Sequence, residues 1–203
     1  MCGPAFVKAE LFICAIPVSG AALFATNNLT DESVKKLLRF TYAVLVAIAV
    51  SSLTVEFLKR PFGRSRFRAM NYAHDFSYYS RWYVLNGQPD KEWMREYFSS
   101  TDACKSFPSG HTQAASLSFC VVMLKDALGI NSKKIKALLW CAPVVCTGTV
   151  ALSRIMVGAH FFSDVLVGGT IGFLTVMLTR EIFVCRGSHI KALKSGQKQE
   201  EKQ

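Results

Sequence analysis

The sequence predicts an all-α integral membrane protein: a helical bundle of about five transmembrane helices, with a long aromatic-rich loop between the second and third. Two observations lead to this class. Hydrophobic residues make up 51% of the 203-residue chain, and they are concentrated in blocks too long for ordinary core helices. Short polar motifs border these blocks, at the mouths of the expected spans. Polar groups in such places cost free energy unless they are paired or used.

The expected spans cover about residues 9–26, 38–58, 112–129, 137–153 and 161–184. A helical span needs about 20 apolar residues, so the third and fourth spans require tilt or snorkelling side chains at their ends. Residues 1–8 lack the basic region of a signal peptide, so we expect 9–26 to be an uncleaved span. Residues 1–186 form the expected membrane-embedded domain, and the polar residues 187–203 form an expected disordered tail.

The most informative segment runs from Ser153 to Asp164 and contains a cation, an imidazole and a carboxylate. If the chain is helical from about His160 onward, His160 and Asp164 share one face of the helix. Asp164 then accepts a hydrogen bond from one ring nitrogen and leaves the other nitrogen free to attack. For this segment alone, a helix start with a satisfied histidine and a capping aspartate is an equal alternative.

A second segment contains Pro-Ser-Gly-His, which ends at His111 and is followed by an apolar run. The pattern predicts a turn and then a helix, whose free backbone N–H groups form an anion site. Gly110 lets the backbone approach a ligand closely. His111 stands at the edge of this site, placed to donate a proton, although a lone loop histidine more often has no role.

A third segment, Lys59–Arg68, holds five cations and no acid. Such runs are usually a solvated or headgroup-facing surface. This run directly follows an apolar segment, whereas the other two motifs directly precede one. We therefore expect all three motifs to lie at one membrane face.

Together the motifs read Lys-x6-Arg-Phe, Pro-Ser-Gly-His and Ser-Arg-x5-His-x3-Asp. Over roughly residues 40–180 the chain resembles membrane-bound bacterial-type members of the type 2 phosphatidic acid phosphatase superfamily, which also includes vanadium haloperoxidases. The second and third motifs match at every defined position. The first departs once, because Phe67 stands where the family has proline. We expect altered loop geometry there, with Lys59 and Arg66 retained.

The resemblance implies hydrolysis of a phosphomonoester or diphosphate through a phosphohistidine. His160 is then the nucleophile, Asp164 holds its tautomer, and His111 is the general acid. The groups implied to bind the phosphoryl oxygens are Lys59, Arg66 and Arg154, with the backbone around Ser109 and Gly110. Phosphoryl transfer mainly requires positioning and charge neutralisation, which these groups supply. No Asp/Glu cluster adjoins the motifs, so we expect no metal and no cofactor.

A lipid phosphate is the expected substrate, because the motifs border membrane spans. Undecaprenyl diphosphate is the first choice, and phosphatidylglycerol phosphate, phosphatidic acid and a lipid A phosphate are the others. Three other classes stay open: a phosphotransferase that uses the same phosphohistidine, a vanadate-dependent haloperoxidase, and a non-catalytic membrane protein of the same fold. Haloperoxidases of this family are soluble, so five apolar spans argue against the second.

Charge sets the expected orientation. Basic residues gather at the first and third connections and in the tail, which the positive-inside rule places in the cytoplasm. The connections 59–111 and 153–160 and the N-terminus then lie outside, so we expect a bacterial plasma-membrane protein with an outward site. The run Lys59–Arg68 opposes this by charge alone, and we attribute it to phosphate binding. The net charge of +10 requires no nucleic-acid partner, because no nucleic-acid motif accompanies it.

The connection 67–107 is rich in Trp and Tyr interleaved with cations, which suits a membrane interface. We expect one or two short surface helices there, either walling a lipid entry path or packing over the ends of the spans. His74 and Asp75 are expected to be structural. Cys104 is the only cysteine expected in an outer loop, so no intrachain disulfide is predicted. Families of this type usually have six spans, so we expect that the first of these spans is missing from this sequence.

Overall fold

The computed structural model describes residues 31–85 and 101–185, and all of the regular structure in these ranges is helical. The predicted span 9–26 and the tail 187–203 lie outside the described residues. The all-α class is therefore confirmed for the part of the chain that is described. Its elements are α2 (Asp31–Phe62), α3 (Phe67–Ala73), η2 (Thr101–Cys104), α5 (Gly110–Ser116), η3 (Leu117–Cys120), α6 (Val121–Ala127), α7 (Lys133–Met156), α8 (Phe162–Thr179) and η4 (Arg180–Cys185).

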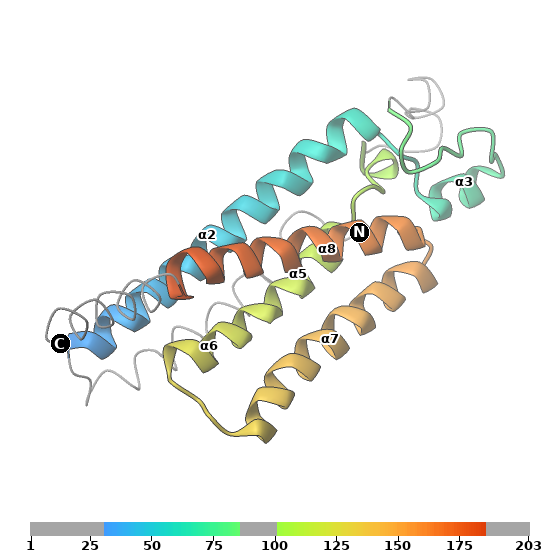
Figure 1. Ribbon diagram of the computed structural model, residues 1–203. Coiled ribbons are helices and arrows are strands. Elements are labelled where there is room, and N and C mark those ends of the chain that lie inside the picture. Colours follow the sequence, from blue (N-terminus) through green and yellow to red (C-terminus); the bar gives the residue numbers. More distant parts are fainter. Residues whose placement is uncertain (1–30, 86–100, 186–203) are drawn as a thin grey trace, which may run out of the picture.

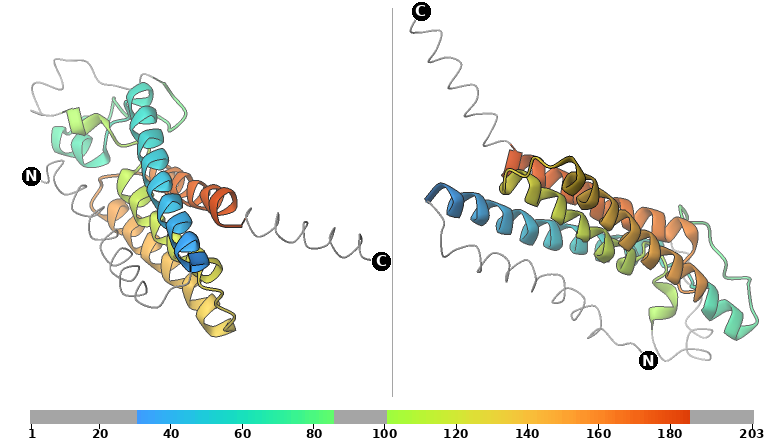
Figure 2. Two further views of the ribbon diagram at one scale, coloured as in Figure 1. Left: turned by 90° about the vertical axis from the view of Figure 1, so that its left-hand side faces the viewer. Right: turned by 90° about the horizontal axis from the view of Figure 1, so that it is seen from below.

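The long helices lie side by side as an elongated bundle (Figures 1 and 2). Within the described residues, three stretches are long and apolar enough to cross a membrane: Lys36–Ala73, Lys133–Met156 and Phe162–Cys185. The predicted count of five is not confirmed. The expected third span, 112–129, is divided among α5, η3 and α6, and none of these pieces is long enough to qualify by itself.

The bundle is packed at its centre and apolar on its outside. Phe40 of α2, Met123 of α6 and Val176 of α8 are fully buried and belong to one core cluster. Large apolar side chains such as Leu53 and Val145 remain exposed on the outer faces of α2 and α7. Large exposed apolar surfaces mark contact with another apolar phase. In helices of this length, that phase is the lipid bilayer.

Two glycines let α8 approach α5 at backbone distance. A Cβ on Gly168 would lie 2.3 Å from the carbonyl oxygen of Ser109, and one on Gly172 would lie 1.9 Å from Ser116 Oγ. Glycines four residues apart permit this close packing of helices in membranes. The position of α8 therefore fixes the segment that carries Pro-Ser-Gly-His.

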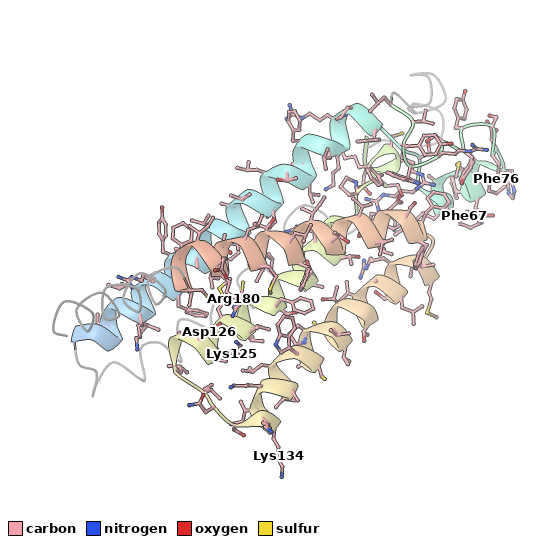
Figure 3. The ribbon with its side chains drawn as sticks, viewed as in Figure 1. Phe67, Phe76, Lys125, Asp126, Lys134 and Arg180 are labelled. Carbon is pink, nitrogen blue, oxygen red and sulfur yellow. The ribbon has the colours of Figure 1, made fainter. Side chains whose placement is uncertain are left out.

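A cluster of charged side chains joins two helices at the end of the bundle away from the Pro-Ser-Gly-His segment (Figure 3). Arg180 Nε donates to Asp126 Oδ2 at 2.7 Å, and Lys125 Nζ donates to Asp126 Oδ1 at 2.9 Å. Arg180 begins the π-helical turn η4 that follows α8. These contacts link the end of α6 to the end of α8.

The described part of the 67–107 connection includes α3 and η2. His74 caps the C-terminus of α3 with a left-handed backbone conformation (φ 51°), and Asp75 Oδ1 accepts hydrogen bonds from the N–H and hydroxyl of Ser77. Both residues thus have structural contacts here. Cys104 is only 4% exposed and packs against Ala69. Cys104 thus lies in the connection where it was expected, but its side chain is buried.

Candidate active site

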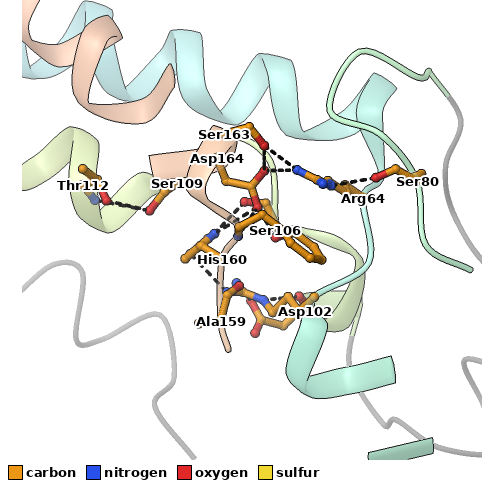
Figure 4. Close-up of polar contacts among 12 residues, drawn as sticks. Arg64, Ser80, Asp102, Ser106, Ser109, Thr112, Ala159, His160, Ser163 and Asp164 are labelled. Carbon is orange, nitrogen blue, oxygen red and sulfur yellow. Dashed lines mark hydrogen bonds and ion pairs between the residues drawn. The ribbon is translucent and has the colours of Figure 1, made fainter. Parts of the chain in front are cut away.

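The three motifs meet at one end of the bundle. The C-terminal end of α2 and the loop after it, the segment before α5, and the turn between α7 and α8 converge there (Figures 1 and 4). Their side chains touch over long sequence separations: Arg64 reaches Asp164, and Arg66 reaches His160. These contacts bring the three motifs together at one end of the bundle. That this end lies at a membrane face stays a prediction.

His160 is held before helix α8, not within it. The helix begins at Phe162, and Phe161 is its N-cap. A tight turn precedes His160: Gly158 has φ 63°, and the N–H groups of Ala159 and His160 both donate to the carbonyl of Arg154, at 3.1 and 3.3 Å. Glycine adopts this left-handed conformation without strain. The turn presents the buried His160 ring to the site.

The His160 ring is fixed in one tautomer by a backbone carbonyl. Its Nδ1 lies 2.6 Å from the carbonyl oxygen of Ser106. A carbonyl can only accept, so Nδ1 carries the hydrogen and Nε2 carries the lone pair. Nε2 in turn lies 3.2 Å from Arg66 Nη1, which donates to it. His160 therefore presents an unprotonated nitrogen next to a guanidinium.

The surroundings of His160 keep its ring neutral. Burial, reinforced by the positive charge of Arg66, lowers the pKa of His160 from 6.5 to about 3, against the opposing effect of the Ser106 carbonyl. His111 and Lys59 lower this pKa further. Burial and neighbouring cations disfavour a second proton on the imidazole ring, because that proton would make the ring cationic. At neutral pH the nitrogen facing Arg66 is a free base.

The sequence predicts a direct hydrogen bond between Asp164 and His160, and the structure does not contain one. Asp164 Oδ2 is 3.9 Å from His160 Nδ1, beyond hydrogen-bonding distance, because the Ser106 carbonyl occupies that nitrogen. Oδ2 instead accepts from the Ser106 hydroxyl at 2.5 Å and from the Phe161 N–H at 2.9 Å. Asp164 thus acts on His160 through Ser106, whose hydroxyl it binds and whose carbonyl orients the ring (Figure 4).

Arg64 is the partner of Asp164 that sequence reasoning missed. Its Nη1 donates to Asp164 Oδ1 at 2.5 Å and to Ser163 Oγ at 2.8 Å, and its Nε donates to the Ser80 carbonyl at 2.9 Å. Its guanidinium carbon lies 4.0 Å from the centroid of the Phe161 ring. Arg64 stands in the basic run, but the run gives no sign of which cation turns toward the acid. This pair locks the start of α8 to the end of α2.

Arg66 is held on two sides. Nε donates to the Asp102 carbonyl at 2.9 Å, Nη2 to Asp102 Oδ1 at 3.0 Å, and Nη1 to the Ala159 carbonyl at 3.0 Å. The side chain is 9% exposed. Its guanidinium is therefore pre-positioned beside His160 Nε2, where a phosphoryl group bound to that nitrogen would carry negative charge.

Lys59 approaches the other side of the Pro-Ser-Gly-His turn. A Cβ on Gly110 would lie 3.3 Å from Lys59 Nζ. The lysine is half-buried, and its Nζ donates at 2.5 Å to Oε1 of Glu56, which is largely exposed. Gly110 thus leaves room for the lysine head. The Glu56 carboxylate therefore competes for Lys59 with the anion that this lysine is expected to bind.

The remaining residues predicted for the site differ in whether their polar groups already have a hydrogen-bond partner. Arg154, in the last turn of α7, has a buried Nε without a hydrogen-bond partner among the described residues. The N–H of Ser109 donates to the Asp164 carbonyl at 2.9 Å, so it serves the fold and is not free for an anion. The ring of His111 lies 6.4 Å from that of His160, centroid to centroid. Gly110 remains the expected backbone donor of that turn.

Aromatic residues form a wall beside the site. Phe161 packs edge-on against Tyr79 at 5.6 Å and Phe67 at 6.4 Å, between ring centroids. Phe67, which stands in place of the family's proline, thereby contacts the turn that carries His160. Within residues 31–85 and 101–185 no group of three or more His, Cys, Asp or Glu side chains is placed to hold a metal ion. Metal independence stays a prediction.

A comparison with protein families matches the PAP2 superfamily over residues 40–187, well over half of the chain. The chain belongs to the PAP2 superfamily. This confirms the resemblance drawn from the three motifs. No solved structure matches the chain.

Two curated relatives are lipid A 1-phosphatases from Rhizobium. The protein of Rhizobium johnstonii is 28% identical over 149 residues, which cover 73% of this chain and 50% of the relative. That of Rhizobium etli is 26% identical over 153 residues, covering 75% of this chain and 54% of the relative. The chain thus spans about half the length of the curated relatives it matches.

Proposed function

We propose that this protein is a membrane lipid phosphate phosphatase that works through a phosphohistidine on His160. The observation that carries the proposal is the ring itself: a neutral imidazole with its Nδ1–H held by the Ser106 carbonyl and its Nε2 beside Arg66. A nucleophile needs an unprotonated atom held in a fixed direction. Nε2 of His160 meets both conditions, and its hydrogen bond from Arg66 gives way when it attacks phosphorus.

In the first step Nε2 of His160 attacks phosphorus, and the bond from phosphorus to the lipid oxygen breaks. His111 gives its proton to that oxygen, which leaves as an alcohol or a lipid monophosphate. In the second step water attacks phosphorus, the P–N bond breaks, and His111 takes a proton from the water. Phosphate is released and the ring of His160 returns to its neutral form.

Cations compensate the charge that develops on the phosphoryl oxygens. Arg66 is fixed beside Nε2, Arg154 has an unused buried Nε, and Lys59 adjoins Gly110. Their charges are pre-positioned, which is the main source of catalysis in phosphoryl transfer. Asp164 supports the cationic ring of the intermediate at 3.9 Å, without a direct hydrogen bond.

The relatives guide the choice of substrate. Because both are named lipid A 1-phosphatases, we place the 1-phosphate of lipid A first in the test panel. Undecaprenyl diphosphate, which the sequence analysis placed first, now follows, with phosphatidylglycerol phosphate and phosphatidic acid. All four present a terminal phosphoryl group on a membrane-anchored lipid, which matches a site at the end of an apolar bundle.

The test is phosphate release from these four lipids by the purified full chain in detergent. We expect release from at least one lipid, retained in EDTA and inhibited competitively by orthovanadate, which adopts the five-coordinate geometry of the transfer step. A parallel assay with lipid and sugar acceptors separates hydrolysis from phosphotransfer. Activity lost in EDTA and restored by Mg²⁺, or no release from any of the lipids, would contradict the proposal.

A further inference from the structure

An apolar groove lies directly beside the candidate active site, between α5, α7 and α8. Its volume is about 320 Å³. Its walls include Thr112 of α5, Gly148 and Ala151 of α7, and Phe162 and Gly169 of α8. Phe162 is 69% exposed, so the rim of the groove opens to the outside of the bundle.

The groove begins at the level of the catalytic motifs and runs along α8. Phe162 follows His160 by two residues, and Phe173 is the farthest lining residue on this helix. At 1.5 Å per residue the two positions are about 16 Å apart along the helix axis. The groove therefore runs from the start of α8 toward the middle of that helix.

Thr112 connects the groove to the site. Its hydroxyl lies 3.1 Å from Ser109 Oγ, and its N–H donates to the same oxygen. Its methyl group faces Gly169, where an added Cβ would lie 3.4 Å away. One residue thus contacts the Pro-Ser-Gly-His turn on one side and lines the groove on the other.

We propose that this groove binds the hydrocarbon chain of the substrate lipid while its phosphoryl group reaches His160. The inference rests on the proposed function and adds a chain-binding subsite to it. The groove adjoins the Pro-Ser-Gly-His turn through Thr112, it is lined mostly by apolar side chains, and the exposed Phe162 lies at its rim. A hydrocarbon chain is the part of a lipid phosphate that such a surface stabilises.

The place of the groove favours the chain of the substrate lipid as its occupant. Thr112 joins the groove to the Pro-Ser-Gly-His turn, and most of the other lining side chains are apolar. Two glycines keep it open: a Cβ on Gly148 would meet nothing within 4 Å, and one on Gly169 would make only ordinary contacts. An added Cβ at either position thus meets no clash, so a larger side chain there can extend into the groove.

The experiment compares butyl phosphate with dodecyl phosphate, which share one phosphoryl group and one kind of leaving oxygen. The variants are Gly148→Leu and Gly169→Leu, from opposite walls of the groove. Each should lower kcat/KM for dodecyl phosphate relative to butyl phosphate by about tenfold, the effect of losing roughly two buried methylene groups. Cys146→Leu, at an exposed position of α7 outside the groove lining, should leave the ratio unchanged.

A labelling readout keeps the test independent of turnover. Dodecyl phosphate with a photoreactive group at its chain end should label peptides of α7 and α8 in the wild type, and the label should fall several-fold in Gly148→Leu. Unchanged ratios in both glycine variants together with labelling outside the groove would overturn the inference. A changed oligomeric state in Gly148→Leu would instead assign the groove to a second copy. If no phosphate is released while the groove is labelled, the proposed function fails and the chain-binding site stands.

Discussion

A backbone carbonyl, and not a carboxylate, sets the tautomer of His160. The Ser106 carbonyl accepts a hydrogen bond from Nδ1–H at 2.6 Å. The carboxylate oxygens of Asp164 accept hydrogen bonds from the Ser106 hydroxyl, from Arg64 and from the Phe161 N–H. The carboxylate therefore organises the residues around the nucleophile. At the residue scale, the roles of His160, Arg64 and Asp164 can be separated by measuring turnover, ring protonation and stability in single variants.

The first prediction concerns the nucleophile. His160→Ala should lose phosphatase activity by several orders of magnitude, because a covalent nucleophile contributes several kcal/mol to transition-state stabilisation. Thermal unfolding in detergent should show that the variant still folds. His74→Asn is the matched control, since His74 is exposed and lies in a left-handed cap that asparagine tolerates. Activity of His160→Ala within about tenfold of wild type would remove His160 from the mechanism.

The second prediction concerns protonation. Because the pKa of His160 is lowered to about 3, nitrogen-15 NMR of labelled histidine should show its ring as the neutral Nδ1–H tautomer at pH 5. As pH falls below 6.5, the unfolded chain takes up this proton before the folded chain does. The group therefore destabilises the fold progressively between pH 6.5 and about 3. The resonance is assigned by its absence in His160→Ala, and a midpoint near 6.5 would contradict the assignment.

The third prediction concerns Arg64. Arg64→Ala leaves Asp164, which is fully buried, without its cation. Breaking a buried pair from one side costs about 3–5 kcal/mol, so the thermal midpoint should drop strongly. Arg64→Ala combined with Asp164→Asn removes the orphan charge and should recover much of the stability. Activity should stay low in the double variant, because Ser106 loses the carboxylate that orients it. Equal instability of the single and double variants would show that the charge pair is not the cause.

At the scale of elements, the site depends on how closely α8 packs against α5. The Ser109 carbonyl would lie 2.3 Å from a Cβ on Gly168, and backbone cannot swing aside as a side chain can. The same turn is fixed to α8 by the hydrogen bond from the Ser109 N–H to the Asp164 carbonyl. A shift of α8 away from α5 would break this hydrogen bond and displace the turn that carries His111 relative to Asp164.

The fourth prediction is that Gly168→Ala lowers both stability and activity. Overpacking of this kind costs about 1–3 kcal/mol, and the accompanying displacement of the turn should reduce kcat more than tenfold. Thermal midpoint and phosphate release are measured on the same preparation. Cys141→Ala, at an exposed position of α7, serves as the control. Wild-type activity in Gly168→Ala would mean that the turn tolerates the shift and that the close packing serves stability alone.

At the scale of the whole molecule, all three motifs lie at one end of the bundle and the Lys125–Asp126–Arg180 cluster at the other (Figures 1 and 3). The two ends of such a bundle face opposite sides of a membrane. The positive-inside rule predicts that the end with the motifs faces outward, against the opposing charge of Lys59–Arg68. Cys104 is unsuitable as a reporter, because it is buried and burial raises the pKa of its thiol.

The fifth prediction tests this sidedness with two exposed positions at opposite ends. In a background without other cysteines, Leu85→Cys should react with a membrane-impermeant maleimide on intact cells, and Ser132→Cys should react only after permeabilisation. Both side chains are exposed. The reverse pattern would place the site in the cytoplasm and move inner-leaflet lipids such as phosphatidic acid to the front of the substrate panel.

The sequence by itself determined the helical class, the family and the convergence of the motifs, because apolar blocks and fixed motif spacings are local properties of the chain. It placed His160, Arg66 and Lys59 in one region before any contact was known. Only the tertiary structure decided that Arg64 and not His160 pairs with Asp164, and that the Ser106 carbonyl orients the nucleophile. It also decided how closely α8 approaches the Pro-Ser-Gly-His turn at Gly168. Those contacts join residues that are far apart in the chain, and no local pattern states which of several cations or carbonyls a buried group will meet.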